Sequence, residues 1–175
     1  MPSNAQREMS ETFCVNWHNA VSDPVWILDR VALAAHLRQL SEHGGWRTGF
    51  DPGRLAEALA WPRRIYSAIN GSQRTEELAA AYAEAVIKLQ PFEEGNIRTA
   101  FLLAILFLRL NGILLPAQPK EKLSAISRLA RGKISRAVFA EWITLRQLAN
   151  ANPGKAVVKI RVANNKITQV SILNP

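Results

Sequence analysis

The chain has 175 residues, of which 48% are hydrophobic and 21% charged, so it is long enough for one domain with a buried core and too short for two full domains. Its single cysteine excludes an internal disulfide framework, and no spacing of cysteine and histidine resembles a zinc site. The formal net charge of +8 favours contact with nucleic acid, a nucleotide or an acidic protein. Because the first residues lack the pattern of a signal peptide and no apolar run could span a bilayer, we expect a soluble protein of the reducing cytoplasm without membrane contacts.

The first predicted helix follows a polar N-terminal extension that ends at the breaker Asp23-Pro24. From Trp26 to Leu40 the apolar residues recur at helical spacing, and Gly44-Gly45 then stops the helix. His36 and His43 lie seven residues apart without a carboxylate partner. We therefore interpret these histidines as structural or surface residues and not as metal ligands.

The second predicted helix has clear signals at both ends. Asp51 can cap it, and Pro52 suits its first position because that N–H would have no partner in the helix. Pro62 lacks a backbone donor, so we predict that the helix ends there. After it, Ile65 to Thr75 contains Asn70-Gly71, which predicts a turn-rich connector.

A third helix is predicted from Thr75 to Leu89. Thr75 can act as its cap, and Glu76 and Glu77 lie where the helix dipole is positive. The alanine-rich body suits close packing against other helices. This helix leads directly to Gln90 and the polar loop that follows.

The loop and the helix after it form the central feature of the sequence. The run Ala100 to Leu108 has no polar residue, which predicts a helix at the centre of a bundle. Just before it, Gly95 and Asn96 tolerate positive φ, so the backbone can aim successive N–H groups at one anion, which the dipole of the next helix also attracts. Arg98 adds donors suited to phosphate, and Glu94 adds a carboxylate able to hold Mg²⁺ that bridges phosphate oxygens.

Two more helices are predicted after a break at Pro116–Pro119. They cover Glu121–Ala130 and Ser135–Leu148, with Gly132 between them. The segment Lys120–Arg136 contains six basic residues and one acid. It is either a patch for RNA or DNA phosphates or a solvated helix face, and the lack of interleaved aromatic residues favours the solvated face.

The C-terminal tail differs in kind from the rest of the chain. After the linker at residues 150–154, the β-branched runs Ala156–Ala163 and Lys166–Leu173 flank Asn164-Asn165, a pair that suits a two-residue hairpin turn. An isolated hairpin is marginal in water. This hairpin therefore needs the helical domain, a second copy of the chain or another protein as a partner.

The loop sequence resembles a known family signature. The stretch Gln90-Pro-Phe-Glu-Glu-Gly-Asn-Ile-Arg98 is similar to the His-x-Phe-x-(Asp/Glu/Asn)-(Gly/Ala)-Asn-x-Arg signature of the Fic/Doc superfamily. Thr99-Ala100 after the arginine and Leu110-Asn111-Gly112 at the helix end are similar to its Doc (death-on-curing) branch. Two residues depart from the pattern: Gln90 stands where the family has its catalytic histidine, and Ile97 stands where the Doc branch usually has lysine.

A second stretch carries the same resemblance. Residues 44–62 combine a Gly-Gly-rich loop, an acidic residue and a Leu-x-x-Ala-Leu-x-x-Pro helix, formed by Asp51, Leu55, Ala58, Leu59 and Pro62. This order is similar to the Doc branch. With both stretches included, the resemblance covers roughly residues 26–145, which is most of the chain.

The resemblance implies a mainly α-helical fold: a Fic/Doc-like helical bundle around the central apolar helix, with a C-terminal β-hairpin. We expect an N-terminal extension over residues 1–25, a Doc-like helical domain over residues 26–149 and a hairpin appendage over residues 150–175. In Fic-type folds, the region that corresponds to Ile65–Thr75 forms a flap where target peptides dock. The resemblance thus implies a substrate-facing loop there.

In family terms, the chain would be a toxin-like enzyme. It would transfer phosphate, as in the Doc branch, or AMP, as in Fic proteins, from ATP or another nucleotide triphosphate to a hydroxyl of a protein such as a translation factor. The resemblance places Glu94 on Mg²⁺, the backbone of Gly95 and Asn96 with Arg98 on the phosphates, and a base at position 90. Gln90 cannot be that base because an amide does not titrate near neutral pH, so we predict impaired transfer.

Three interpretations follow from these observations. The chain is an impaired or inactive Doc relative that still binds nucleotide or a partner, an active enzyme that uses another base, or a nucleic-acid-binding module that uses Lys120–Arg136. The resemblance also implies a separate antitoxin, because the chain lacks the (Ser/Thr)-x-x-x-Glu-(Gly/Asn) pattern of Fic proteins that inhibit themselves. A homodimer through the C-terminal hairpin is a further alternative. Gln90 is either natural or engineered, and the wild-type codon 90 decides between these.

Overall fold

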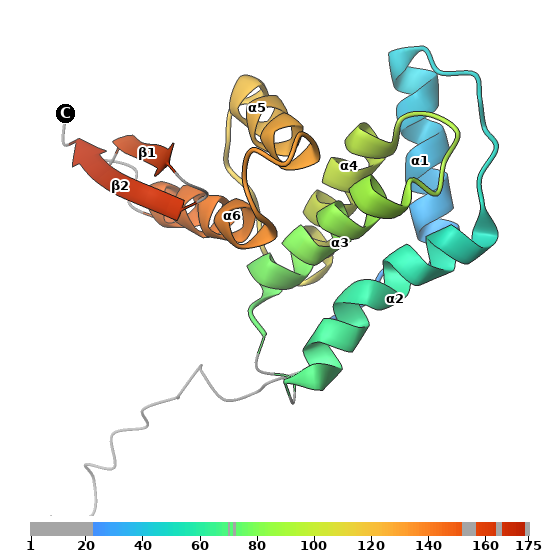
Figure 1. Ribbon diagram of the computed structural model, residues 1–175, viewed down its shortest axis with the longest axis horizontal. Coiled ribbons are helices and arrows are strands. Elements are labelled where there is room, and N and C mark those ends of the chain that lie inside the picture. Colours follow the sequence, from blue (N-terminus) through green and yellow to red (C-terminus); the bar gives the residue numbers. More distant parts are fainter. Residues whose placement is uncertain (1–22, 70, 72, 152–156, 164–165, 174–175) are drawn as a thin grey trace, which may run out of the picture.

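The structure is a computed structural model that describes residues 23–69, 71, 73–151, 157–163 and 166–173. These residues form six helices and two strands (Figure 1). The helices are α1 (Asp29–His43), α2 (Pro52–Ala68), α3 (Thr75–Leu89), α4 (Asn96–Leu110), α5 (Pro119–Ala130) and α6 (Arg136–Ala151). The prediction of a mainly α-helical protein is confirmed. In this part of the chain, no helix combines the length and apolar content needed to cross a membrane.

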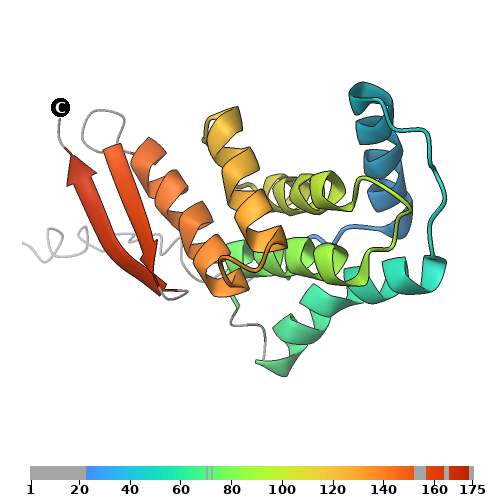
Figure 2. The ribbon, with the colours of Figure 1, turned by 45° about the horizontal axis from the view of Figure 1, so that its top comes forward.

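The helix at the centre of the bundle is α3. It packs against α2, α4, α5 and α6 (Figure 2). Most of its residues between Leu78 and Val86 are buried, and the many alanines among them let neighbouring helices approach closely. Tyr82 of α3 also packs on Phe107 of α4, with ring centroids 5.0 Å apart.

The apolar run of α4 is buried or partly buried throughout, as predicted, but α3 has contacts with more helices. α4 buries one face, which includes Leu103 and Phe107, whereas Phe101 and Ile105 on its other side are only partly buried. The small side chains of α3 allow helices to pack on several of its sides, so α3 takes the central position. An entirely apolar sequence predicts that a helix is buried, but it does not predict which of two buried helices contacts more of the others.

Several predicted helix ends are confirmed. Gly44 ends α1 in the left-handed conformation, with φ of 80°. The Asp51 side chain caps α2 by accepting a hydrogen bond from the Arg54 N–H at 3.0 Å. Asn111 follows the last residue of α4, and its side chain also bonds both backbone groups of Val25, which ties the start of the described chain to this helix.

The prediction that α2 ends at Pro62 is wrong, because the helix continues to Ala68. A proline inside a helix removes one hydrogen bond and costs about 3 kcal/mol. Pro62 is itself buried, and Ile65 and Tyr66 on the next turn pack against the core. Burial of these side chains offsets the lost hydrogen bond.

The cap of α3 and the start of α4 differ from the prediction. α3 begins at Thr75, but Arg74 occupies the N-cap position and no side chain caps the helix. α4 begins at Asn96, so Asn96–Thr99 form its first turn and do not belong to the loop. The loop is therefore shorter than the sequence pattern suggested.

The strands β1 (Val157–Ala163) and β2 (Lys166–Leu173) pair antiparallel, with Val157 opposite Leu173. β1 lies beside α6 (Figure 2). The predicted turn at residues 164–165 and the N-terminal extension up to residue 22 lie outside the described residues. The hairpin and the division into three segments therefore stay predictions.

Candidate functional site

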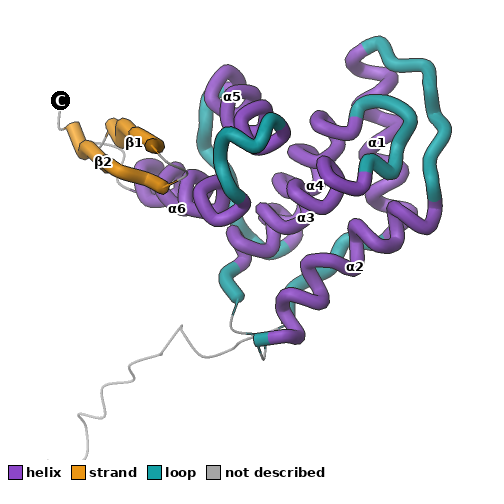
Figure 3. The backbone as a smooth tube through the Cα atoms, in the orientation of Figure 1, coloured by secondary structure: helices purple, strands orange, loops and turns teal. Residues whose placement is uncertain are grey.

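Two loops meet at one end of the helical bundle. We call residues 90–95, between α3 and α4, the motif loop, and residues 44–51, between α1 and α2, the flap (Figure 3). The Glu93 N–H donates to Gly49 O at 3.0 Å, and the Asp51 N–H donates to Pro91 O at 2.8 Å. An antiparallel bridge joins Phe50 and Phe92. The flap thus borders the motif loop along its backbone.

Positive φ angles and one side chain curl the motif loop. Gln90 and Gly95, at its two ends, have φ of 44° and 73°. Asn96 closes the curl, because its Oδ1 accepts from the Phe92 N–H at 3.1 Å and its Nδ2 donates to Phe92 O at 2.7 Å. The Asn96 side chain thus has a structural role that the sequence pattern did not predict.

The carboxylate of Glu94 is half-buried and faces the flap. Its Oε1 accepts from the Arg47 N–H at 3.2 Å, and a Cβ atom at Gly45 would overlap with the same oxygen. Glu93, which is exposed, lies against Gly49. Within the described residues, Glu94 Oε2 has no hydrogen-bond partner. One oxygen of Glu94 is therefore available to a cation.

The first turn of α4 carries unpaired donors. Its first N–H groups have no carbonyl one turn earlier to bind, and the Thr99 N–H is the first to do so, at 2.9 Å from Gly95 O. Arg98 is exposed and has no hydrogen bond or ion pair with the described part of the chain. The positive end of the α4 helix dipole also lies at this first turn. The structure thus brings Glu94, Gly95, Asn96 and Arg98 together at one helix end.

Gln90 lies at the other end of the same loop. It is the C-cap residue of α3, its side chain is exposed, and its N–H donates to Val86 O at 3.0 Å. Its side-chain amide makes no hydrogen bond with the described residues. Ile97 is also exposed, at 46%. Both residues that depart from the family pattern therefore face solvent.

Two buried polar side chains of α1 lie against the motif loop, and the sequence analysis did not assign them to the site. His36 is fully buried; its Nδ1 lies 2.9 Å from Thr99 Oγ1, and its ring stacks on Phe92 with centroids 3.7 Å apart. Gln39 is 4% exposed, and a Cβ atom at Gly95 would overlap with its Nε2. The available signal was a pair of polar residues three apart on the apolar face of a helix.

His36 is a neutral structural residue, as interpreted from the sequence. Burial lowers its pKa below the ordinary 6.5, the nearby charge of Glu94 opposes this shift, and Arg98 adds to it. His43, at the end of α1, is exposed and does not share this environment. Among the described residues, no cluster of three or more histidine, cysteine or acidic side chains could hold a metal.

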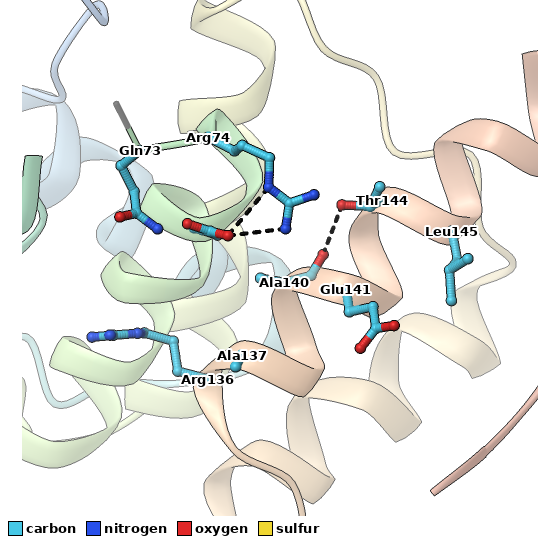
Figure 4. A pocket seen from close by; sticks show the side chains of 9 residues that line it. Gln73, Arg74, Arg136, Ala137, Ala140, Glu141, Thr144 and Leu145 are labelled. Carbon is cyan, nitrogen blue, oxygen red and sulfur yellow. Dashed lines mark hydrogen bonds and ion pairs between the residues drawn. The ribbon is translucent and has the colours of Figure 1, made fainter. Parts of the chain in front are cut away.

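A pocket of about 530 Å³ lies at the opposite end of α3, between its first turn and α6 (Figure 4). Its lining has balanced charge, because it includes Arg74 and Arg136 as well as Glu77 and Glu141. Arg74 donates to Glu77 at 2.9 Å. A phosphate would have to compete with partners that are already in place.

The substrate-facing role expected for Ile65–Thr75 stays a prediction, and this segment does not lie beside the motif loop. Residues 65–68 belong to α2, and Gln73 and Arg74, just before α3, line the pocket. α3 has 15 residues, which corresponds to about 22 Å, so this connector lies a helix length from the motif loop. The flap at residues 44–51 takes the place beside the motif loop instead.

The basic segment Lys120–Arg136 covers α5 and the start of α6. Arg136 pairs with Glu84 at 3.3 Å, so one of its positive charges is neutralised within the bundle. Glu121 pairs with Arg146 at 2.8 Å. The other five basic residues of the segment form no ion pair with the described residues, so the solvated helix face and the nucleic-acid patch stay alternatives.

Residues 26–108 match the model of the Fic/DOC family, a span that includes the flap, the motif loop and most of α4. The chain belongs to the Fic/Doc family, in its Doc-like branch. It is 35% identical over 118 residues to "Protein kinase doc" from Escherichia phage P1, which covers 66% of this chain and 89% of that protein. The resemblance predicted from the two sequence stretches is confirmed.

Proposed function

We propose that the chain is a Doc-like, toxin-type protein that binds a nucleotide triphosphate with Mg²⁺ at the motif loop and the first turn of α4. The observation that carries this proposal is that Arg98 and the first N–H groups at the same helix end have no partner among the described residues. Phosphate oxygens satisfy both kinds of donor, and the helix dipole favours their charge. The pocket near Arg74 offers no such combination, because its arginine is already paired.

The residues of the site fit an Mg²⁺ ion that arrives with the nucleotide. Magnesium is usually held by one or two carboxylates together with substrate phosphates and water. Glu94 supplies one carboxylate oxygen that has no hydrogen-bond partner among the described residues. Those residues contain no cluster of three or more histidine, cysteine or acidic side chains that could hold the ion without the nucleotide. When bound, the ion would neutralise charge on the phosphates during transfer.

The proposed reaction is transfer of phosphate or AMP to a protein hydroxyl. The hydroxyl oxygen attacks a phosphorus atom, the bond from that phosphorus to the leaving oxygen breaks, and the hydroxyl proton passes to a base. Gln90 cannot accept this proton, and loss of general-base help typically costs about 10²–10⁴-fold in rate. We therefore propose slow transfer with nucleotide binding retained. The name of the phage relative, a protein kinase, supports phosphate as the transferred group.

The proposed partners are a target protein, such as a translation factor, and an antitoxin. The sequence has no self-inhibitory (Ser/Thr)-x-x-x-Glu-(Gly/Asn) pattern, so restraint would come from a second protein that covers the motif loop. An open reading frame for such a protein should adjoin the gene. If none does, and the protein with histidine at position 90 is harmless on expression, the toxin part of the proposal fails.

Calorimetry with ATP and Mg²⁺ tests the proposed site. Arg98→Ala should raise the Kd about 10–100-fold, the range expected for lost charge-assisted hydrogen bonds. Arg109→Ala is the matched control, because Arg109 is an exposed arginine near the other end of the same helix. Absence of binding at millimolar nucleotide, or equal effects of the two substitutions, would contradict the proposal.

A further inference from the structure

His36 of α1 contacts both ends of a curled segment that includes part of the motif loop and the first turn of α4. The curl runs from Phe92 to Thr99, and Asn96 closes it with two hydrogen bonds to Phe92. The His36 ring stacks on Phe92 with an interplanar angle of 11°, and His36 Nδ1 lies 2.9 Å from Thr99 Oγ1. A single side chain from a different helix thus spans the curl.

The second contribution of α1 is Gln39, one turn further along the helix. Its Nε2 occupies the space that a Cβ atom at Gly95 would fill. Gly95 is the residue with φ of 73° that starts the first turn of α4. Gln39 therefore supports the loop at the point where the chain reverses into the helix.

Packing alone does not explain these residues. His36 Nε2 and both polar side-chain atoms of Gln39 are buried without a hydrogen-bond partner in the described protein. Burial of unpaired polar atoms lowers stability, and an apolar side chain of similar size would fill the same space without this loss. Buried polar side chains that reduce stability indicate a role other than filling the core.

We propose that His36 and Gln39 are positioning residues for the motif loop. His36 fixes the separation of Phe92 and Thr99, and Gln39 fixes the backbone at Gly95, so α1 sets the direction of the N–H groups in the first turn of α4. The proposal rests on the proposed function for the identity of the ligand. The positioning itself is a property of the protein alone and is tested separately.

Three substitutions separate the contacts of His36. His36→Phe keeps a flat ring on Phe92 and removes the bond to Thr99, whereas His36→Asn keeps an amide near the position of Nδ1 and removes the ring. Thr99→Val removes the hydroxyl and keeps the shape of the side chain. His43→Asn is the matched control, because His43 is an exposed histidine on the same helix.

The first measurement is amide hydrogen exchange without nucleotide. In His36→Phe, the Phe92 and Thr99 amides should exchange about tenfold faster relative to amides of α6, the factor expected for one hydrogen bond. His36→Asn should recover part of the protection, and the double variant His36→Phe/Thr99→Val should resemble either single variant. Equal acceleration throughout the protein, additive effects or unchanged loop exchange would overturn the proposal. If His36→Phe does not fold, Thr99→Val compared with Thr99→Ser decides the same question.

The second measurement is the Kd for ATP with Mg²⁺ in the same variants. It should rise in parallel with loop exchange and stay unchanged in His43→Asn. Should the parent protein bind no nucleotide, the proposed function fails, and hydrogen exchange still decides the positioning role. For Gln39, the loop exchange caused by Gly95→Ala should be partly reversed by adding Gln39→Ala, which removes the overlap; an unchanged or worse result would exclude its role.

Discussion

The two ends of α3 differ in how their charges are paired. At its first turn, the helix lines a pocket in which Arg74 pairs with Glu77 and the neighbouring Arg136 pairs with Glu84. Its last turn leads through the motif loop to the first turn of α4, where Arg98 and the first N–H groups have no partner within the described chain. Both ends carry arginines and glutamates, so composition does not distinguish them.

The two ends differ in how their arginines are paired within the described residues, and not in the presence of charge or of a cavity, which is why we propose the ligand site at the motif end. At the pocket end, both arginines of the lining are already paired, although ion pairs as exposed as Arg74–Glu77 contribute little to stability. At the motif end, Arg98 and the first N–H groups of α4 have no partner among the described residues and could bind an anion. Substitutions at the two ends should therefore have different effects.

The largest expected effect is on transfer activity. Gln90→His restores an imidazole that titrates near neutral pH and should raise transfer about 10²–10⁴-fold. Labelled phosphate and labelled AMP transferred from ATP into cell-lysate proteins would be measured. Gln73→His, at the pocket end of α3, is the control and should have no effect.

Ile97 limits the first prediction. If a lysine at this position shapes the nucleotide pocket, as in the Doc branch, full activity requires the double variant Gln90→His/Ile97→Lys. If the parent, the single variant and the double variant all bind nucleotide but transfer no label, the chain is a binding protein on a Doc-like scaffold.

The second prediction concerns the glycines of the flap. Gly45→Ala would force its new Cβ atom against Glu94 and the buried Leu40, and it should lower the free energy of unfolding by about 1–3 kcal/mol. Gly49→Ala meets only the exposed carboxylate of Glu93, which can move, so its effect should be smaller. Urea denaturation measures both, and equal losses would show that Leu40 and Glu94 adjust freely.

Glu84 lies in the second half of α3 and pairs with Arg136 of the pocket lining, and Glu84→Gln should affect stability without affecting nucleotide binding. It removes the partner of Lys88 and Arg136, and the expected loss is about 1 kcal/mol because both cations stay partly solvated. Thermal unfolding and calorimetry with ATP and Mg²⁺ are the two measurements. A weaker nucleotide affinity would remove the distinction between the two ends.

The smallest expected effect is a pH dependence from the motif end. Burial lowers the pKa of His36, so the unfolded chain binds more protons than the folded protein just below pH 6.5. The contribution of neutral His36 to stability is therefore complete above pH 6.5 and is lost as the pH falls through the lowered pKa. The stability difference between the parent and His36→Asn, measured by urea denaturation at several pH values, should shrink on acidification; a constant difference argues against a buried neutral imidazole.

Local sequence signals predicted most helices and the candidate site. Asp51, Gly44 and Gly112 act within their own helix ends, so their effect could be inferred from nearby residues. The motif from Gln90 to Arg98 is also local, and its residues do gather at one helix end. Pro62 is the exception, because contacts of the following turn with the core outweigh its effect on the backbone.

The sequence by itself thus determined the helical class, the family and the residues of the motif loop, because periodicity, caps and motif spacing act over a few residues. Only the tertiary structure decided which helix is central, that residues 44–51 and not Ile65–Thr75 border the site, and that His36 and Gln39 lie against it. His36 and Thr99 are 63 residues apart in the chain. Contacts of this kind depend on how several helices pack at once, which no local pattern specifies.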